Sequence, residues 1–199
     1  MKNSKLLPLA IVLMAVGAFG IIGLGIYSFQ GFNNLTGMRG MMSGGKVILS
    51  STVLNMQHSA TKEVVNKAKN SITFTQSTVN LVVLAAPPAR PGDYWEIDGL
   101  INPTIYIKTG TTLRVTLVNE DNKMHGFELV TAHPPFSAYP MMSYGDVFNS
   151  FIMPIGGTNT NQYHTAKQTI NPSNAGTYYY LCPVPHHAAM GMYGKLVVS

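Results

Sequence analysis

The sequence predicts an all-β sandwich preceded by one N-terminal transmembrane helix. From residue 46 onward, many short β-type runs follow one another, separated by turn residues such as Gly, Pro and Asn. No long amphipathic helical pattern interrupts them, and short strands at close spacing favour an antiparallel sandwich or barrel. Ahead of these runs, residues 6–29 carry no charged side chain. We therefore expect a membrane anchor at 1–29, a flexible linker at 30–45 and a β domain at 46–199.

The anchor is predicted from the length of the uncharged run at residues 6–29. About 20 apolar residues are enough to cross the hydrocarbon core as a helix. A cleaved signal peptide would have an apolar core of about 7–15 residues followed by an Ala-x-Ala-like site, and neither feature fits. Lys2 and Lys5 stay in the cytoplasm under the positive-inside rule, a prediction that Arg39 and Lys46 weaken without reversing. We expect a single-pass protein of the cell membrane with its β domain on the extracellular side.

The linker is rich in Gly, Asn and Ser, as tethers are. Its three methionines, Met38, Met41 and Met42, could gather Cu(I), but we interpret them as ordinary linker residues. Asn34 begins an Asn-Leu-Thr triplet that fits the N-glycosylation acceptor, a pattern with many false positives.

The β domain is predicted element by element. A first strand is expected at 47–54, and a short helix at 60–69 with Thr61 as its N-cap. Further strands are expected at 71–75, 80–84, 94–97, 104–108, 112–118, 126–130, 168–170, 177–181 and 195–198. Alternation along the strand at 177–181 places Tyr178, Tyr180 and Cys182 on one face, which we expect to point inward.

Composition limits the classes of function. Charged residues make up 11% of the chain, with 13 basic and 8 acidic side chains, against roughly 25% in soluble domains. The basic residues are scattered, so nucleic-acid binding is not favoured. A small number of carboxylates would suit a strongly acidic medium, because carboxylates that are paired in the fold lose their contribution to stability when they are protonated. Compositional drift explains the small number equally well. A single cysteine, Cys182, permits no internal disulfide.

Soft metal ligands gather near the C-terminus. Cys182, His187 and Met192 follow one another with four residues in each interval. Thiolate, imidazole and thioether together select copper, whereas zinc sites use Cys, His and carboxylate but not Met. A copper site that shuttles one electron needs a second histidine, and the candidates are His58, His125, His133 and His164. We favour His125, because it precedes the strand at 126–130 and so lies where a neighbouring strand meets the same end of a sandwich.

A resemblance to the copper loop of the cupredoxins is carried by residues 176–195, Gly-Thr-Tyr-Tyr-Tyr-Leu-Cys-Pro-Val-Pro-His-His-Ala-Ala-Met-Gly-Met-Tyr-Gly-Lys. Within that family the segment is most similar to the sulfocyanins and rusticyanins, the membrane-anchored blue copper proteins of acidophiles. The resemblance implies an eight-stranded, cupredoxin-like Greek-key β-sandwich that binds one type 1 copper ion. It assigns the metal ligands as His125, Cys182, His187 and Met192, whereas His186 and Met190 miss the family spacing.

The resemblance also implies a function. We expect a one-electron carrier, not an enzyme, in an extracytoplasmic respiratory chain, with membrane-bound donors and acceptors such as a terminal oxidase. The edge of the His187 ring is expected to open through the surrounding apolar loop toward such a partner. The alternative is a copper chaperone or scavenger without redox shuttling. A cysteine hydrolase is disfavoured, because Pro183 and Pro185 prevent a helix from starting after Cys182 and lowering its pKa.

Overall fold

The computed structural model describes residues 46–58, 63–157 and 162–199. They belong to one compact unit, Gly44–Ser199. The predicted anchor and linker, with Asn34 and the three linker methionines, lie outside the described residues. Among the residues that are described, no helix is long and apolar enough to cross a membrane.

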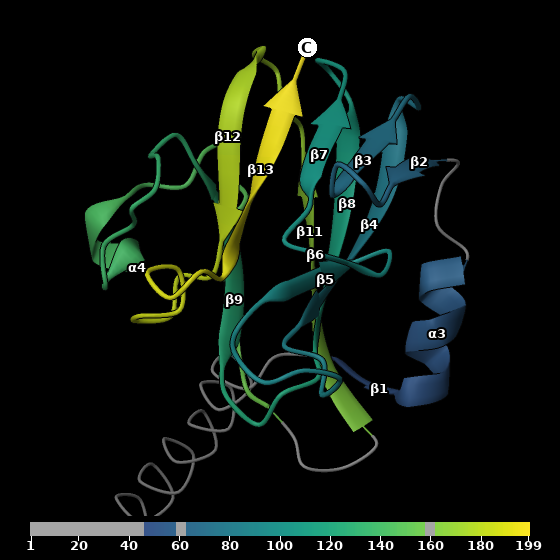
Figure 1. Cartoon of the computed structure of the whole chain (residues 1–199), viewed down its shortest axis with the longest axis vertical. Coiled ribbons are helices and arrows are strands. Elements are labelled where there is room, and N and C mark those ends of the chain that lie inside the picture. The colour runs from purple at the N-terminus through teal and green to yellow at the C-terminus, as the bar shows by residue number, and fades with distance from the viewer. Residues whose placement is uncertain (1–45, 59–62, 158–161) are drawn as a thin grey trace, which may run out of the picture. The chain divides into compact units, whose positions relative to one another are not determined.

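The described residues form thirteen strands and two short helices. Figure 1 shows the strands in two facing layers, with α3 (Ser50–His58) and α4 (Pro140–Ser143) on the outside. The strands are β1 (Lys46–Leu49), β2 (Glu63–Asn66), β3 (Ser71–Phe74), β4 (Thr78–Ala85), β5 (Trp95–Ile97), β6 (Leu100–Ile101), β7 (Thr104–Ile107), β8 (Thr112–Asn119), β9 (His125–Val130), β10 (Ile152–Ile155), β11 (Gln162–Ile170), β12 (Gly176–Leu181) and β13 (Tyr193–Val198). The all-β sandwich is confirmed, with short additional strands beyond the eight that the resemblance implies.

The strand order explains one difference from the prediction. One sheet has the order β1-β11-β8-β4-β5-β6, and the other has the order β10-β9-β12-β13-β7-β3-β2. Three neighbouring pairs, β4–β8, β3–β7 and β7–β13, are parallel, so the sandwich has mixed pairing where antiparallel pairing was expected. After β4 the chain passes through β5 and β6, crosses to β7 in the other sheet and returns as β8. Such crossovers place parallel strands side by side, and alternation along one strand cannot reveal them.

The core lies between the two sheets. It is built from alternate residues of both, and its largest members include Trp95, Phe127 and Tyr180. Tyr178, Tyr180 and Cys182 are all buried in this core, which confirms the face predicted from alternation. Because these side chains are packed in the core, we expect the end of β12 to hold the sulfur of Cys182 in a fixed position.

The N-terminal part of the domain differs from the prediction. The strand expected at 47–54 ends at Leu49, where α3 begins. Val53 of α3 is buried against Val82, Leu84 and Val118, which face outward from β4 and β8. Tertiary packing therefore decides the helical state here, because the β-branched residues of this segment would favour a strand by propensity alone.

The helix expected at 60–69 is also wrong. Its described residues form β2 and a turn that leads into an antiparallel pairing with β3. In that turn Asn70 has a φ of 46°, and its N–H donates to the carbonyl of Lys67 at 3.2 Å. The Lys69 N–H donates to Asn66 Oδ1 at 3.0 Å. Asn accepts the left-handed conformation and such local bonds more readily than most residues, so the segment closes a hairpin.

Candidate metal centre

Three strands bring the predicted metal ligands to one end of the sandwich. His125 is the first residue of β9, and Cys182 follows the last residue of β12. These strands are paired, with Leu181 opposite Glu128. Met192 immediately precedes β13, which pairs with β12 on its other side. Residues 182–192, the Cys–Met loop, therefore leave and re-enter one sheet beside His125.

Backbone hydrogen bonds hold the Cys–Met loop closed. The Cys182 N–H donates to the Met192 carbonyl at 3.2 Å, and the Met192 N–H donates to the His187 carbonyl at 2.9 Å. The His187 N–H in turn donates to the carbonyl of Val184 at 3.2 Å. The spacing of the three side chains is thus set by a locally bonded turn.

The nitrogen and sulfur atoms lie at distances that suit one shared metal ion. Cys182 Sγ is 3.8 Å from His125 Nδ1 and 3.5 Å from His187 Nδ1. Metal–sulfur and metal–nitrogen bonds of about 2.3 and 2.0 Å, at angles between tetrahedral and trigonal, would separate such atoms by roughly 3.5–3.7 Å. His125, Cys182 and His187 each offer one ligand atom, and these atoms all lie within 4.8 Å of one another. All three residues are buried, so they form a candidate metal cluster. The donor set fits a type 1 copper ion.

On its core side this cluster has apolar and closely packed surroundings. Cys182, His125 and Met192 are fully buried, and Cys182 and Met192 belong to the main core. Trp95 and His125 meet edge to face, with ring centroids 6.4 Å apart. Such packing excludes water and limits rearrangement of the side chains.

Burial controls the protonation of the metal-free cluster. It raises the pKa of the Cys182 thiol to about 12, although N–H groups of Gly126 and Val184 that bond the sulfur oppose the shift. Burial also lowers the pKa of His125 and of His187, against the opposing influence of Asp121 and Asp93. A metal that binds here must displace the thiol proton, so its affinity rises with pH.

Gly126 allows the close approach that the cluster needs. A Cβ atom at this position would lie 2.7 Å from the Ile152 carbonyl oxygen and 3.0 Å from Cγ of Pro183. β10 and the start of the Cys–Met loop can therefore pack directly on the backbone beside His125.

Among the described residues, the candidate cluster does not include the other histidines and the second loop methionine considered from the sequence. His164 is in β11 opposite Asn119, and the His133 ring packs on Tyr179. His58 is the last residue of α3. His186 is exposed, and its backbone N–H donates to Ala138 next to α4, which lies beside the Cys–Met loop in Figure 1. Met190 is 66% exposed.

Sequence reasoning missed the charged residues around the two imidazoles. Asp121 Oδ2 lies 3.2 Å from His125 Nε2, and Asp93 Oδ2 lies 3.8 Å from His187 Nε2. Lys123 forms an ion pair with Asp93 at 2.8 Å. Asp121 lies four residues before His125, which is the only local signal for any of them. The expected opening of the His187 edge is small, because its side chain is only 9% exposed.

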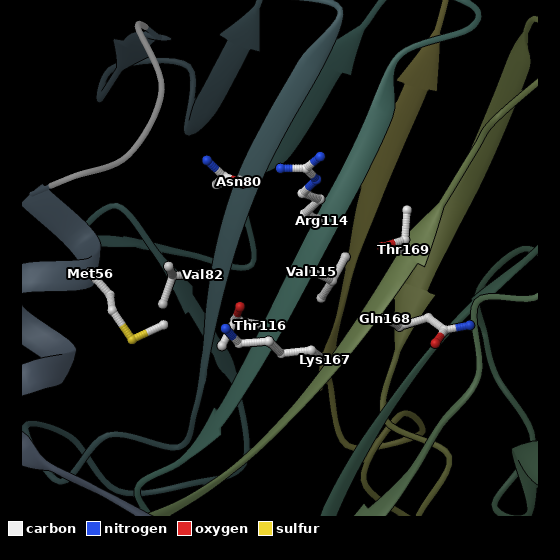
Figure 2. A pocket seen from close by; sticks show the side chains of 9 residues that line it. All are labelled: Met56, Asn80, Val82, Arg114, Val115, Thr116, Lys167, Gln168 and Thr169. Carbon is white, nitrogen blue, oxygen red and sulfur yellow. The ribbon is translucent and has the colours of Figure 1, made fainter. Parts of the chain in front are cut away.

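A separate pocket lies away from this cluster. It has a volume of about 380 Å³ and is lined by α3 and by strands β4, β8 and β11. Figure 2 shows its side chains, among them Arg114, Lys167 and Met56. None of the predicted metal ligands lines it, so the metal chemistry belongs to the buried cluster.

A buried His₂Cys cluster with a methionine at the end of a β-sandwich is typical of a blue copper protein of the cupredoxin class. Comparison with known proteins agrees: a family model described as the Sulfocyanin (SoxE) domain matches residues 64–199. The chain belongs to the sulfocyanin family and is a sulfocyanin- and rusticyanin-like blue copper protein. Its predicted family and its predicted cofactor, a single type 1 copper ion, are confirmed.

Individual relatives support this assignment. The chain is 32% identical to rusticyanin from Acidithiobacillus ferrooxidans over 139 residues, covering 69% of this chain and 87% of the relative. It is 30% identical to sulfocyanin from Sulfolobus acidocaldarius over 103 residues, covering 48% of this chain and 50% of the relative. A 1.27 Å structure of rusticyanin from Thiobacillus ferrooxidans matches with a TM-score of 0.68 and 29% identity, covering 79% of this chain and 98% of that one. Cupredoxins are electron carriers rather than enzymes.

Proposed function

We propose that this protein carries single electrons on the outer side of the cell membrane, with copper bound by His125, Cys182, His187 and Met192. The observation that supports the proposal most directly is the spacing of Cys182 Sγ from the two Nδ1 atoms, 3.8 and 3.5 Å. Copper, when bound, supplies a one-electron couple between Cu(II) and Cu(I). Relatives described as reduced rusticyanin are consistent with such a couple.

The protein's contribution is a ligand set that need not rearrange. Two imidazoles, a thiolate and a thioether would suit both oxidation states of copper in part, so electron transfer would require little movement of the side chains. The closed backbone of the Cys–Met loop and the core around Cys182 hold this arrangement. The soft Met192 and the dry surroundings favour Cu(I), which raises the reduction potential.

Location and partners extend the same proposal. Residues 6–29 are long and uncharged enough to anchor the chain, with the copper domain on the extracellular side. The partners are membrane-bound respiratory donors and acceptors such as a terminal oxidase. Removal of residues 1–29 should move the protein from the membrane fraction to the soluble fraction and leave its copper spectrum unchanged. Retention in the membrane fraction would contradict the anchor.

Copper loading of the full-length chain tests the carrier function. We expect an intense absorption band at about 600 nm, arising from the copper–thiolate bond. A reductant should bleach the band and an oxidant should restore it over repeated cycles without release of copper. Cys182→Ala should abolish the band, whereas Met190→Leu, the matched control in the same loop, should retain it. A colourless protein that binds only Cu(I) would instead support a copper chaperone.

A further inference from the structure

Both imidazoles of the cluster carry a carboxylate at the nitrogen that faces away from Cys182. His125 presents Nδ1 to Cys182 Sγ and Nε2 to Asp121 Oδ2, 3.2 Å away. His187 presents Nδ1 to the same sulfur, and its Nε2 lies 3.8 Å from Asp93 Oδ2. One arrangement therefore occurs twice, with aspartates from two different loops.

Asp121 is held in place by bonds that leave one oxygen for the imidazole. Its Oδ1 accepts the N–H of Asn122 at 2.6 Å, and its own N–H donates to Asn119 Oδ1 at 3.0 Å. Asn119 is fully buried, and its Nδ2 donates to the carbonyls of Lys123 and Ile155. The carboxylate thus has a fixed orientation before any metal binds.

Asp93 is held by an ion pair. Its Oδ1 lies 2.8 Å from Lys123 Nζ, and its side chain is 5% exposed. The carboxylate therefore bridges the ammonium group of Lys123 and the outer edge of His187. Since 3.8 Å exceeds an ordinary hydrogen bond, we expect Asp93 to act on His187 chiefly through its charge.

A neutral imidazole has one N–H and one lone pair, and a metal ligand needs the lone pair on the nitrogen that faces the metal. A carboxylate at Nε2 stabilises the tautomer that has its proton on Nε2, which leaves the lone pair on Nδ1. Negative charge this close to the metal also favours the more highly charged Cu(II) over Cu(I), and we expect a weaker effect from Asp93, because the ammonium group of Lys123 partly offsets its charge.

We infer that Asp121 and Asp93 are positioning residues of the copper centre, which hold His125 and His187 with Nδ1 free for the metal and lower the reduction potential. This inference rests on the proposed copper ligation. Asp121 orients its ring by direct hydrogen bonding, and Asp93 supplies charge together with a link to Lys123. Two opposing influences therefore set the reduction potential: Met192 and burial raise it, and the two carboxylates lower it.

Variants of the full-length chain test the inference, and all of them are measured at one pH, about 6. Asp121→Ala and Asp93→Asn are compared with wild type and with Asp98→Asn, a control in the turn between β5 and β6. Asp121→Ala should weaken Cu(II) binding about 10–100-fold and Cu(I) binding less. Each tenfold loss of Cu(II) affinity relative to Cu(I) affinity raises the reduction potential by about 59 mV. Asp93→Asn should change the ratio in the same direction with less change in the Cu(II) electron paramagnetic resonance spectrum.

A second readout needs no copper. In the metal-free chain, ¹⁵N spectra should show His125 with its proton on Nε2, and Asp121→Ala should give a mixture of both tautomers. A merely structural role would lower the unfolding temperature without changing the tautomer or the affinity ratio. If wild type is blue but both aspartate variants match Asp98→Asn in potential and tautomer, the inference is wrong and the carrier function stands. If wild type itself is not blue, the carrier function is wrong.

Discussion

The two histidines of the cluster make equivalent contacts with Cys182 but are held in different ways. His125 begins a strand, is completely buried and lies at hydrogen-bond distance from Asp121. His187 lies in the Cys–Met loop, is 7% exposed as a residue and faces Asp93 at a longer distance. Its position depends on the loop's own backbone bonds to Val184 and Met192.

This difference suggests separate roles for the two histidines, one in the interior of the site and one on its surface side. The sheet holds His125 as a fixed interior ligand, because β9 is paired on both sides, with β10 and β12. The loop holds His187 nearer the surface, and under the proposed carrier function we expect the electron to pass to a partner through its ring. The following predictions test this division, in order of decreasing effect.

Removal of each imidazole should have the largest effect and should distinguish the two positions. His125→Gly and His187→Gly should both lose the absorption band at about 600 nm. Added imidazole should restore the band in His187→Gly, because the space it leaves borders solvent, and should not restore it in His125→Gly, whose space is enclosed. Titration with imidazole, followed by absorption, measures the recovery. Equal recovery in both variants would contradict the division.

The opposite face of β9 should make stability depend on pH. Burial and the nearby Asp146 raise the pKa of Glu128 to about 7, from an ordinary value of 4.5. Because the folded chain holds this proton more tightly, Glu128 weakens the fold as pH rises from about 4.5 to about 7, by on the order of 3 kcal/mol. Glu128→Gln, which imitates the protonated form, should therefore gain stability over wild type across this window.

Urea unfolding of the metal-free chain at several pH values measures this effect. Burial lowers the pKa of the two imidazoles, which gives stability a pH dependence of the opposite sign, and this contribution cancels in the difference between variant and wild type. Glu96→Gln, which removes a carboxylate from the other sheet, should retain most of the pH-dependent loss. A constant difference between Glu128→Gln and wild type from pH 4 to pH 8 would exclude this role for Glu128.

Glycine substitutions should have the smallest effects on stability. The cause of the loss should differ between the strand β9, which contains Gly126, and the Cys–Met loop, which contains Gly191. Gly126→Ala places a Cβ against β10 and Pro183, and overpacking of this kind costs about 1–3 kcal/mol. Gly191→Ala meets no atom within 4 Å, but its φ of 111° is unfavourable for alanine, at a cost of about 1–2 kcal/mol. Thermal unfolding should show the larger loss for Gly126→Ala, and its absorption band should shift more. The reverse order would show that the loop, not the strand, sets the rigidity of the site.

Much of the strand pattern could be predicted because burial leaves a local signal. Alternation near Tyr178 and Tyr180 identified the inward face of β12, and turn residues marked most strand ends correctly. β10 was missed, and only the last three residues of β11 were predicted. Both contain polar or proline residues that weaken a strand pattern, and they are stabilised by pairing with β9 and β8.

The sequence by itself determined the family and the gathering of Cys182, His187 and Met192, since these residues lie within one short loop whose spacing the backbone enforces. It also indicated which upstream histidine joins them, because His125 lies at a strand start. Only the tertiary structure decided the parallel pairing, the helix α3 and the carboxylates at the two imidazoles. Lys123 and Asp93, for example, are 30 positions apart and meet through the fold. Contacts of that kind depend on how strands cross between sheets, and no local pattern of residues encodes the crossing.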